Sequence, residues 1–147
     1  MAIRGGCLCG GVTFEIERAV GPFEFCHCNR CRKVSGSNAL ATIRVARGDY
    51  RFLSGAELVK SYEAPILRNP PAYRVTFCSQ CGSAVPPPAP EDEFFEIPAG
   101  LFDGDPGIRP DKHIFVEFAP EWDEIRDGLP RYTREEIYEL RKRGRSS

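Results

Sequence analysis

The 147-residue sequence has no long apolar run that could serve as a membrane anchor. A membrane-spanning helix needs about 20 consecutive apolar residues, and no stretch of this chain approaches that length. The first residues, MAIRGG, also lack the apolar core of a secretory signal. These absences predict a cytoplasmic protein without a membrane partner.

The chain also lacks an excess of charge of either sign. Twenty Lys and Arg residues stand against 21 Asp and Glu residues, which gives a formal net charge of −1. Proteins that bind nucleic acid usually present a clustered basic surface, whereas the basic residues here are spread along the sequence. The exception is RKRGR at 141–145, which the favourable interaction of cations with a helix C-terminus accounts for. We therefore expect no nucleic-acid partner.

Cysteine, by contrast, is abundant and tightly clustered. The seven cysteines form three groups: Cys7-x-Cys9, Cys26-x-Cys28-x2-Cys31 and Cys78-x2-Cys81. An odd number leaves one cysteine over in a fully disulfide-bonded scheme, and a reducing cytoplasm disfavours disulfides altogether. Spacings of one or two residues suit two sulfurs that bind the same metal ion. The cysteines therefore predict metal sites.

Counting ligands separates two kinds of zinc site. Four thiolates complete a tetrahedral structural site, whereas three protein ligands leave a position open for water or substrate. Pairing the first group with the third supplies four sulfurs and leaves the middle trio with three, although spacing also permits either pair to join the trio. If residues 26–28 are extended, His27 points away from its flanking cysteines, which favours a supporting role over ligation.

The remaining pattern indicates a single, mainly β domain. Apolar residues alternate with a period of two at 12–16, 39–45 and 73–77, and shorter strand candidates lie at 50–53, 58–62, 94–97 and 114–118. Thirteen prolines and 14 glycines predict long connections and many turns. The only helix signal is at the end of the chain, where Thr133 and Glu136 form a capping box. A length of 147 residues suits one domain, which we expect to span 1–147.

The cysteine motifs resemble those of the glutathione-dependent formaldehyde-activating enzyme (GFA) family, which includes centromere protein V-like proteins. The motifs are GCLCGGV at 6–12, CHCNRCRKVSGS at 26–37 and FCSQCGS at 77–83. Further similarity lies in PAG at 98–100, the segment 109–114, Trp122 and DGLP at 127–130. The resemblance covers about residues 5–132, nearly the whole chain.

This resemblance implies a β-tent fold of packed antiparallel sheets with a short C-terminal helix. It also implies two zinc ions: a structural zinc on Cys7, Cys9, Cys78 and Cys81, and a second zinc on Cys26, Cys28 and Cys31. The family activity joins glutathione and formaldehyde into S-hydroxymethylglutathione and is classed as a carbon–sulfur lyase reaction. The expected substrate is therefore a thiol adduct of formaldehyde or of a related small electrophile.

A mechanism follows from an open zinc position. Metal coordination can ionise a bound thiol such as that of glutathione, and a nearby acid such as His113 could then protonate the alkoxide formed from an aldehyde. The alternative for His113 is a hydrogen-bonded histidine at the end of a strand. Trp122 with Phe102 could line a pocket, although a lone tryptophan is more typical of a core.

Two other function classes fit parts of the sequence. A non-catalytic zinc-stabilised binding or interaction module, or a glutathione carrier, would share the cysteine groups but perform no chemistry. The missing fourth cysteine of the middle group argues against a purely structural role. A redox protein would use the C-x2-C pairs, but thioredoxin-like motifs lie near a βαβ pattern, and the sequence shows no such pattern. A zinc enzyme is the preferred interpretation.

Overall fold

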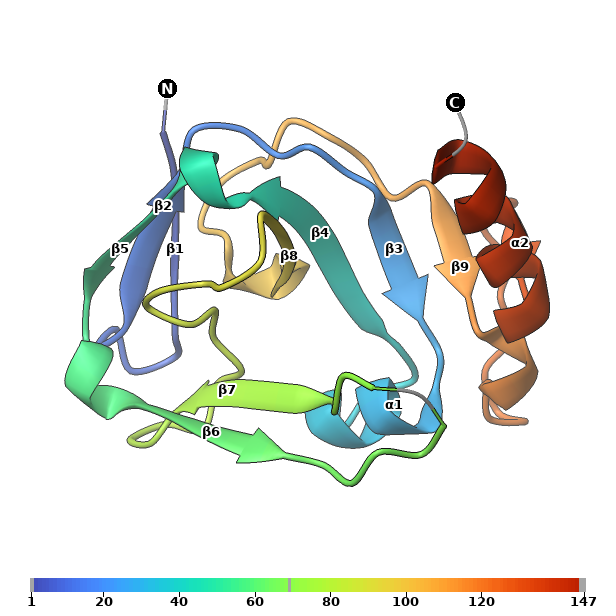
Figure 1. The fold of residues 1–147 in the computed structure, drawn as a ribbon, viewed down its shortest axis with the longest axis horizontal. Helices are drawn as coiled ribbons and strands as arrows, with labels where there is room; N and C mark the ends of the chain where they lie inside the picture. Colours follow the sequence, from blue (N-terminus) through green and yellow to red (C-terminus); the bar gives the residue numbers. More distant parts are fainter. Residues whose placement is uncertain (1, 69, 146–147) are drawn as a thin grey trace. The chain divides into compact units, whose positions relative to one another are not determined.

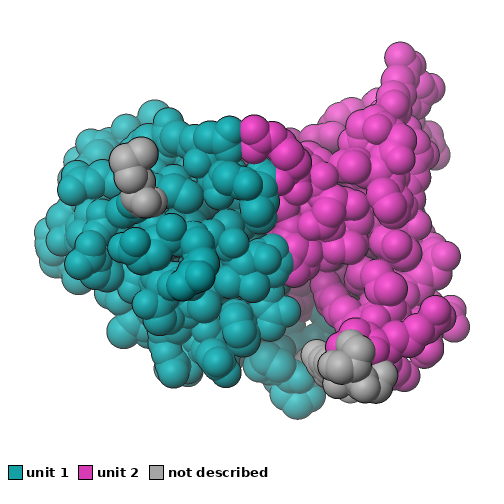
Figure 2. Space-filling model, turned by 90° about the horizontal axis from the view of Figure 1, so that it is seen from above, with its two compact units in different colours: residues 1–21, 43–108 teal, residues 22–42, 109–147 magenta. Residues whose placement is uncertain are grey.

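The computed structural model describes residues 2–68 and 70–145, and the chain forms two compact units. Unit 1 contains residues 1–21 and 43–108, and unit 2 contains residues 22–42 and 109–147 (Figure 2). Each unit contains one group of clustered cysteines. Across the described ranges, no helix is both long enough and apolar enough to span a membrane.

Strands dominate the structure, and the long helix comes at the end of the chain, as predicted (Figure 1). The strands are β1 (Ile3–Gly6), β2 (Thr13–Ile16), β3 (Phe23–Cys26), β4 (Leu40–Ala46), β5 (Tyr50–Ser54), β6 (Val59–Glu63), β7 (Arg74–Cys78), β8 (Phe94–Pro98), β9 (Lys112–Ile114) and β10 (Arg131–Tyr132). The α-helices are α1 (Asn29–Ser35) and α2 (Arg134–Arg145). Short 3-10 turns occupy Arg47–Asp49, Ala56–Leu58, Ala99–Leu101 and Val116–Phe118.

Unit 1 contains antiparallel sheets whose strands follow the period-two pattern of the sequence. β1, β2 and β5 form one sheet, and β6 pairs with β7 in another (Figure 1). The alternating residues Val12, Phe14 and Ile16 are all fully buried, because successive strand side chains point to opposite faces. Six predicted strands, including those at 50–53, 58–62 and 94–97, are confirmed to within one residue at each end.

Unit 2 adds a parallel arrangement that the sequence did not predict. β9 pairs in parallel with both β3 and β10. Beside these strands, Ile114 of β9 and Ile137 of α2 are buried in one cluster with Cys26 and Cys31. Parallel pairing needs a long connection between the strands, and local alternation carries no signal for partners so far apart along the chain.

The predicted strand at 114–118 is wrong beyond its first residue. β9 ends at Ile114, and Phe115 adopts a left-handed conformation with a φ of 57°. Residues with a Cβ rarely adopt this conformation, and it turns the chain into a 3-10 turn in which the Phe118 N–H donates to the Phe115 carbonyl. The apolar residues after Ile114 therefore form a turn.

The sequence also failed to predict α1, a helix of seven residues. Its N-cap is Cys28, whose sulfur accepts a hydrogen bond from the Cys31 N–H at 3.3 Å. Cysteine is not among the usual cap residues, so the sequence had no recognisable signal for the start of this helix. Gly36 ends the helix with a φ of 63°, a conformation that glycine adopts readily.

The capping box at the start of α2 is confirmed. The Thr133 N–H donates to Glu136 Oε1 at 2.9 Å, and the Glu136 N–H donates to Thr133 Oγ1 at 3.2 Å. Replacing Thr133 by alanine is expected to lower the free energy of unfolding by about 1 kcal/mol, because a helix N–H loses its acceptor. Urea denaturation measures the change. Thr133→Ser keeps the oxygen and should retain most of the stability; equal losses in the two variants would contradict the capping role.

Candidate functional site

The first cysteine group lies within unit 1 and joins two turns. Cys7 and Cys9 follow β1, whereas Cys78 ends β7 and Cys81 lies in the turn after it. Their four sulfurs lie within 4.8 Å of one another. Cys9 Sγ is 3.5 Å from Cys7 Sγ and 3.8 Å from Cys78 Sγ. Zn–S bonds of about 2.3 Å in a tetrahedron place sulfurs about 3.8 Å apart, so this group fits a four-thiolate metal site.

Glycines shape the turns that carry these sulfurs. Gly10 and Gly82 have φ values of 78° and 82°, conformations that side chains with a Cβ rarely adopt. The turn before Gly82 closes through a hydrogen bond from the Gly82 N–H to the Cys78 carbonyl. Gly82 thus ends the Cys78–Cys81 turn in the left-handed region.

The four sulfurs differ in burial and in their polar neighbours. Cys78 is fully buried and Cys7 is nearly so, whereas Cys9 is exposed. Ser83 lies beside Cys81, with its hydroxyl 3.4 Å from the sulfur, and it lowers the pKa of Cys81 to about 5 by hydrogen bonding. A thiolate is the form that binds metal, so this environment favours metal binding.

The second cysteine group lies within unit 2 and uses α1. Cys26 ends β3, Cys28 caps α1 and Cys31 lies in the first turn of that helix. The three sulfurs also lie within 4.8 Å of one another. Cys26 and Cys31 are buried against Ile114 and Ile137, and Cys28 is half-buried. In the part of the chain that the structure describes, this group has three candidate ligands and the first has four.

Electrostatics within this trio favour a bound cation. Hydrogen bonds from the Cys26 and Cys31 thiols lower the pKa of Cys28, whereas hydrogen bonding with Cys28 raises the pKa of Cys26, and hydrogen bonding with Cys26 and Cys28 raises the pKa of Cys31. Cys28 is therefore favoured as a thiolate, and Cys26 and Cys31 are favoured as neutral thiols, because like charges in one site disfavour each other's ionisation. A divalent cation offsets this repulsion, so the trio could also hold a metal ion.

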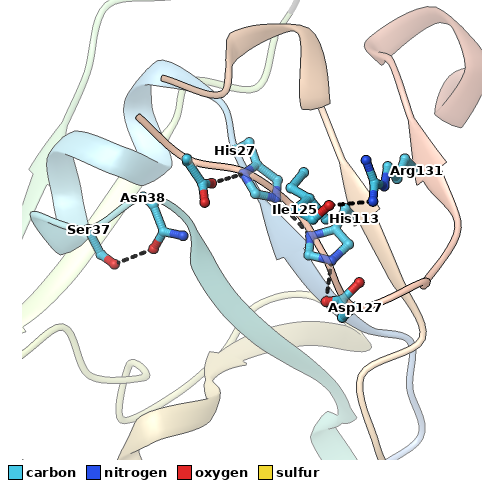
Figure 3. A network of polar contacts seen from close by, with 8 residues as sticks. His27, Ser37, Asn38, His113, Ile125, Asp127 and Arg131 are labelled. Atoms are coloured by element: carbon cyan, nitrogen blue, oxygen red, sulfur yellow. Dashed lines mark hydrogen bonds and ion pairs between the residues drawn. The ribbon is translucent and has the colours of Figure 1, made fainter. Parts of the chain in front are cut away.

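The two histidines form a buried pair (Figure 3), and His27 lies between Cys26 and Cys28 in the sequence. His27 Nε2 lies 2.8 Å from His113 Nδ1, and His113 Nε2 lies 2.7 Å from an Asp127 carboxylate oxygen. Both imidazoles are at least 95% buried, with His27 at 1% and His113 at 5% exposure. Burial lowers the pKa of His27, and the neighbouring His113 lowers it further. His27 is thus engaged with His113 and does not join the cysteine group.

His113 reaches this position through strand register. β3 pairs with β9 so that Phe25 is the partner of His113 and Cys26 is the partner of Ile114. The Phe25 ring stacks on the His113 imidazole with centroids 4.9 Å apart. The predicted candidate His113 therefore lies one register position from the partner of Cys26, although both its ring nitrogens already have partners.

The sequence patterns assigned no role to two acidic residues of this region, Asp123 and Asp127, and the prediction that Trp122 lies in the core is wrong. Asp127 bonds His113, and Asp123 Oδ2 lies 3.6 Å from His27 Nδ1. The DGLP motif marked Asp127 without assigning it a role, and Asp123 carried no signal beyond its place in a short acidic loop before β10. Trp122 was expected in the core, but it is 73% exposed. Phe102 packs edge-on against Phe14 within unit 1, and Trp122 belongs to unit 2.

Two comparisons by sequence identify the same family. The family model described as glutathione-dependent formaldehyde-activating enzyme matches residues 2–118. A Halomonas elongata protein named "Putative glutathione-dependent formaldehyde-activating enzyme" is 33% identical over 130 residues, which are 85% of this chain and 82% of that protein. A crystal structure of a Rhodobacter sphaeroides protein matches with a TM-score of 0.51 at 19% identity, covering 88% of this chain and 99% of that one. The crystal structure supports the fold alone.

Proposed function

The chain belongs to the glutathione-dependent formaldehyde-activating enzyme family, and from this premise we propose that it is a zinc-dependent carbon–sulfur lyase. Its substrate is a glutathione adduct of formaldehyde, or the adduct of another thiol with a related small electrophile. The observation that carries this proposal is the unequal ligand count: four sulfurs converge in unit 1 and three in unit 2. Three protein ligands are typical of catalytic zinc.

The two cysteine groups have different proposed roles. Cys7, Cys9, Cys78 and Cys81 hold a structural zinc. Cys26, Cys28 and Cys31 hold a second zinc, which, when bound, supplies an acid strong enough to ionise a coordinating thiol. Cys28 is the half-buried member of this trio, so we propose that substrate approaches from its side.

The proposed role of His113 is positioning. Its two ring nitrogens contact His27 and Asp127, and the imidazole is 5% exposed. Asp127 holds the His113 ring, and His113 in turn holds His27 between two metal-binding cysteines. Such outer contacts orient ligand residues in metal sites, and their loss commonly costs about 10- to 100-fold in metal affinity or activity.

Three further proposals concern the extent of the domain, the small-molecule partner and the cellular location. A single GFA-like domain spanning 1–147 is supported by the family match to residues 2–118, which includes segments of both units. Glutathione as the small-molecule partner is supported by the family's name. A cytoplasmic location is supported by cysteine groups that suit metal binding, because a reducing compartment keeps thiols available as ligands.

Thiol binding to the zinc-loaded protein tests the proposed function. Glutathione is expected to bind with release of a proton, because a thiol that binds a cation is deprotonated. Calorimetry in buffers of different ionisation enthalpy measures that proton. S-methylglutathione is the matched control, since its thioether has no proton to lose; it should bind at least about 10-fold more weakly, without proton release.

Turnover is the second part of the test. A zinc-loaded enzyme should accelerate formation or breakdown of S-hydroxymethylglutathione above the rate in buffer, as followed by NMR. Proton release without acceleration would identify a glutathione carrier. Equal binding of the two ligands with no proton released would contradict the zinc–thiol interaction and favour a non-catalytic binding module.

A further inference from the structure

The C-terminal helix α2 is attached to unit 2 by little buried surface. The helix has 12 residues. Among residues 134–144, whose side chains the structure describes, Ile137 is buried at 1% exposure and Arg134 is half-buried, while the others are exposed. A helix this short is marginal in water by itself and depends on its packing. Elements with few buried apolar contacts open locally at a lower free-energy cost than core strands, so we expect α2 to open before the strands of unit 2.

The buried side chain of α2 packs on the three-cysteine group. Ile137 belongs to the cluster that contains Cys26, Cys31 and Ile114, and Figure 1 shows α2 alongside β9, the strand of Ile114. Cys26 and Cys31 are each 8% exposed, whereas Cys28 is half-buried. The side chain that anchors α2 therefore also covers two of the three sulfur-bearing residues. When α2 opens, Ile137 leaves the cluster, and Cys26 and Cys31 lose that cover.

The start of α2 is held by hydrogen bonds at the surface. The Arg134 N–H lies 3.1 and 3.2 Å from the two carboxylate oxygens of Glu117. One residue earlier, Thr133 forms the capping box with Glu136. All of these bonds are exposed to solvent. A substitution at this end of the helix therefore changes the stability of α2 without altering a cysteine or Ile137.

The later part of α2 is held in register with β3 by an ion pair. Arg141 Nη2 lies 3.7 Å from a carboxylate oxygen of Glu24, whose side chain is 5% exposed and also lies 3.3 Å from Lys112 Nζ. Glu24 precedes Cys26 by two residues, so both side chains lie on the same face of β3. Arg141 follows Ile137 by four residues, so both lie on the same face of α2. The ion pair therefore holds α2 in the position that places Ile137 against the cysteine cluster.

We propose that α2 is the cover that retains the metal ion of the second cysteine group, and that this ion enters and leaves when α2 opens. The assignment rests on the proposed function, because it takes Cys26, Cys28 and Cys31 as a metal site. It separates two routes: the substrate approaches beside Cys28, and the metal ion exchanges on the side of Ile137. The four-cysteine group lies in unit 1, and among the described residues its core cluster has none in common with that of Ile137. Its metal ion should therefore exchange independently of α2.

Zinc release from variants with a loosened α2 tests the assignment. The zinc-loaded protein is mixed with excess EDTA, and the zinc left on the protein is followed with time; Cys28→Ser, which lacks the second site, identifies release from the first. Thr133→Ala is expected to release the second zinc about 5-fold faster, because loss of an N-cap raises the population of open helix by that factor. Release from the first group should stay within about 2-fold of wild type, as for an independent site. Thr133→Ser keeps the capping oxygen and should release both ions at the wild-type rates.

A second variant loosens the other end of α2 through a different contact. Arg141→Ala removes the ion pair with Glu24 and should speed release of the second zinc about 2- to 5-fold. Its matched control is Lys142→Ala, which removes a neighbouring cation whose ion pair with Glu139 lies within the helix. This control should change the rate by less than about 2-fold. Hydrogen exchange separates opening of the helix from a general loss of stability: in Arg141→Ala the amides of α2 should exchange faster by the same factor, and those of β3 and β9 should not.

Failure of this assignment and failure of the proposed function give different results. Faster exchange of the α2 amides without faster zinc release would overturn the assignment alone, because the second zinc would then leave independently of α2. Equal acceleration of both zinc ions, or of the amides of α2, β3 and β9 together, would indicate general destabilisation and would also overturn it. A wild-type protein that binds zinc at the four-cysteine group alone would instead contradict the second metal site and, with it, the proposed function. Zinc release requires neither a thiol nor turnover, so these results do not depend on activity.

Discussion

Replacing Cys78 by serine is expected to destabilise the protein by several kcal/mol and to remove one equivalent of zinc. Cys78 is fully buried, and its sulfur lies 3.8 Å from that of Cys9, 69 positions away in the sequence. A covalent cross-link closing a loop of this length is worth about 4 kcal/mol in chain entropy, and structural zinc binding contributes directly to folding. Because domains are stable by only about 5–15 kcal/mol, a large fraction of unfolded or insoluble protein should result.

Metal analysis together with thermal melting checks this expectation. The control is Ser79→Ala, an exposed position in the same turn, which should change stability by less than about 0.5 kcal/mol. A Cys78→Ser variant with the wild-type melting temperature and full metal content would exclude the four-cysteine group as a structural metal site.

Replacing Cys28 by serine is expected to abolish activity while leaving the protein folded. The substitution removes one of three sulfurs from the second group, and we expect metal affinity at that group to fall by at least about 100-fold, since even outer contacts cost 10- to 100-fold. Cys28 also caps α1 through the Cys31 N–H. Serine is a preferred cap residue, so the helix keeps its N-terminal acceptor, and stability should stay within about 1 kcal/mol of wild type.

Cys28→Ala separates the two roles of this residue. Alanine removes the sulfur and the cap together, so it should lose the second zinc like serine but be less stable than Cys28→Ser by about 1 kcal/mol. Circular dichroism and metal analysis on the same samples give both quantities. Global unfolding of Cys28→Ser, with Cys78→Ser remaining folded, would reverse the structural and catalytic assignments of the two cysteine groups.

The sequence was most informative where the signal is local. The alternation of Val12, Phe14 and Ile16 predicted a buried strand face, because strand side chains alternate with a period of two. Thr133 and Glu136 predicted the start of α2 from a spacing of three residues. The cysteine spacings predicted two metal sites with unequal ligand numbers, since sulfurs one or two residues apart bind the same ion.

Tertiary structure decided what depends on partners far apart along the chain. His27 and His113 are 86 positions apart, and their contact arises from the parallel register of β3 and β9. This register depends on burial of both faces of the strands and on the long connection between them. No short sequence pattern encodes it. The same holds for Asp123, which reads as one acid of a polar loop. In the fold its side chain is 12% exposed, and its Oδ2 lies 3.6 Å from His27 Nδ1, a neighbour almost 100 positions away in the sequence.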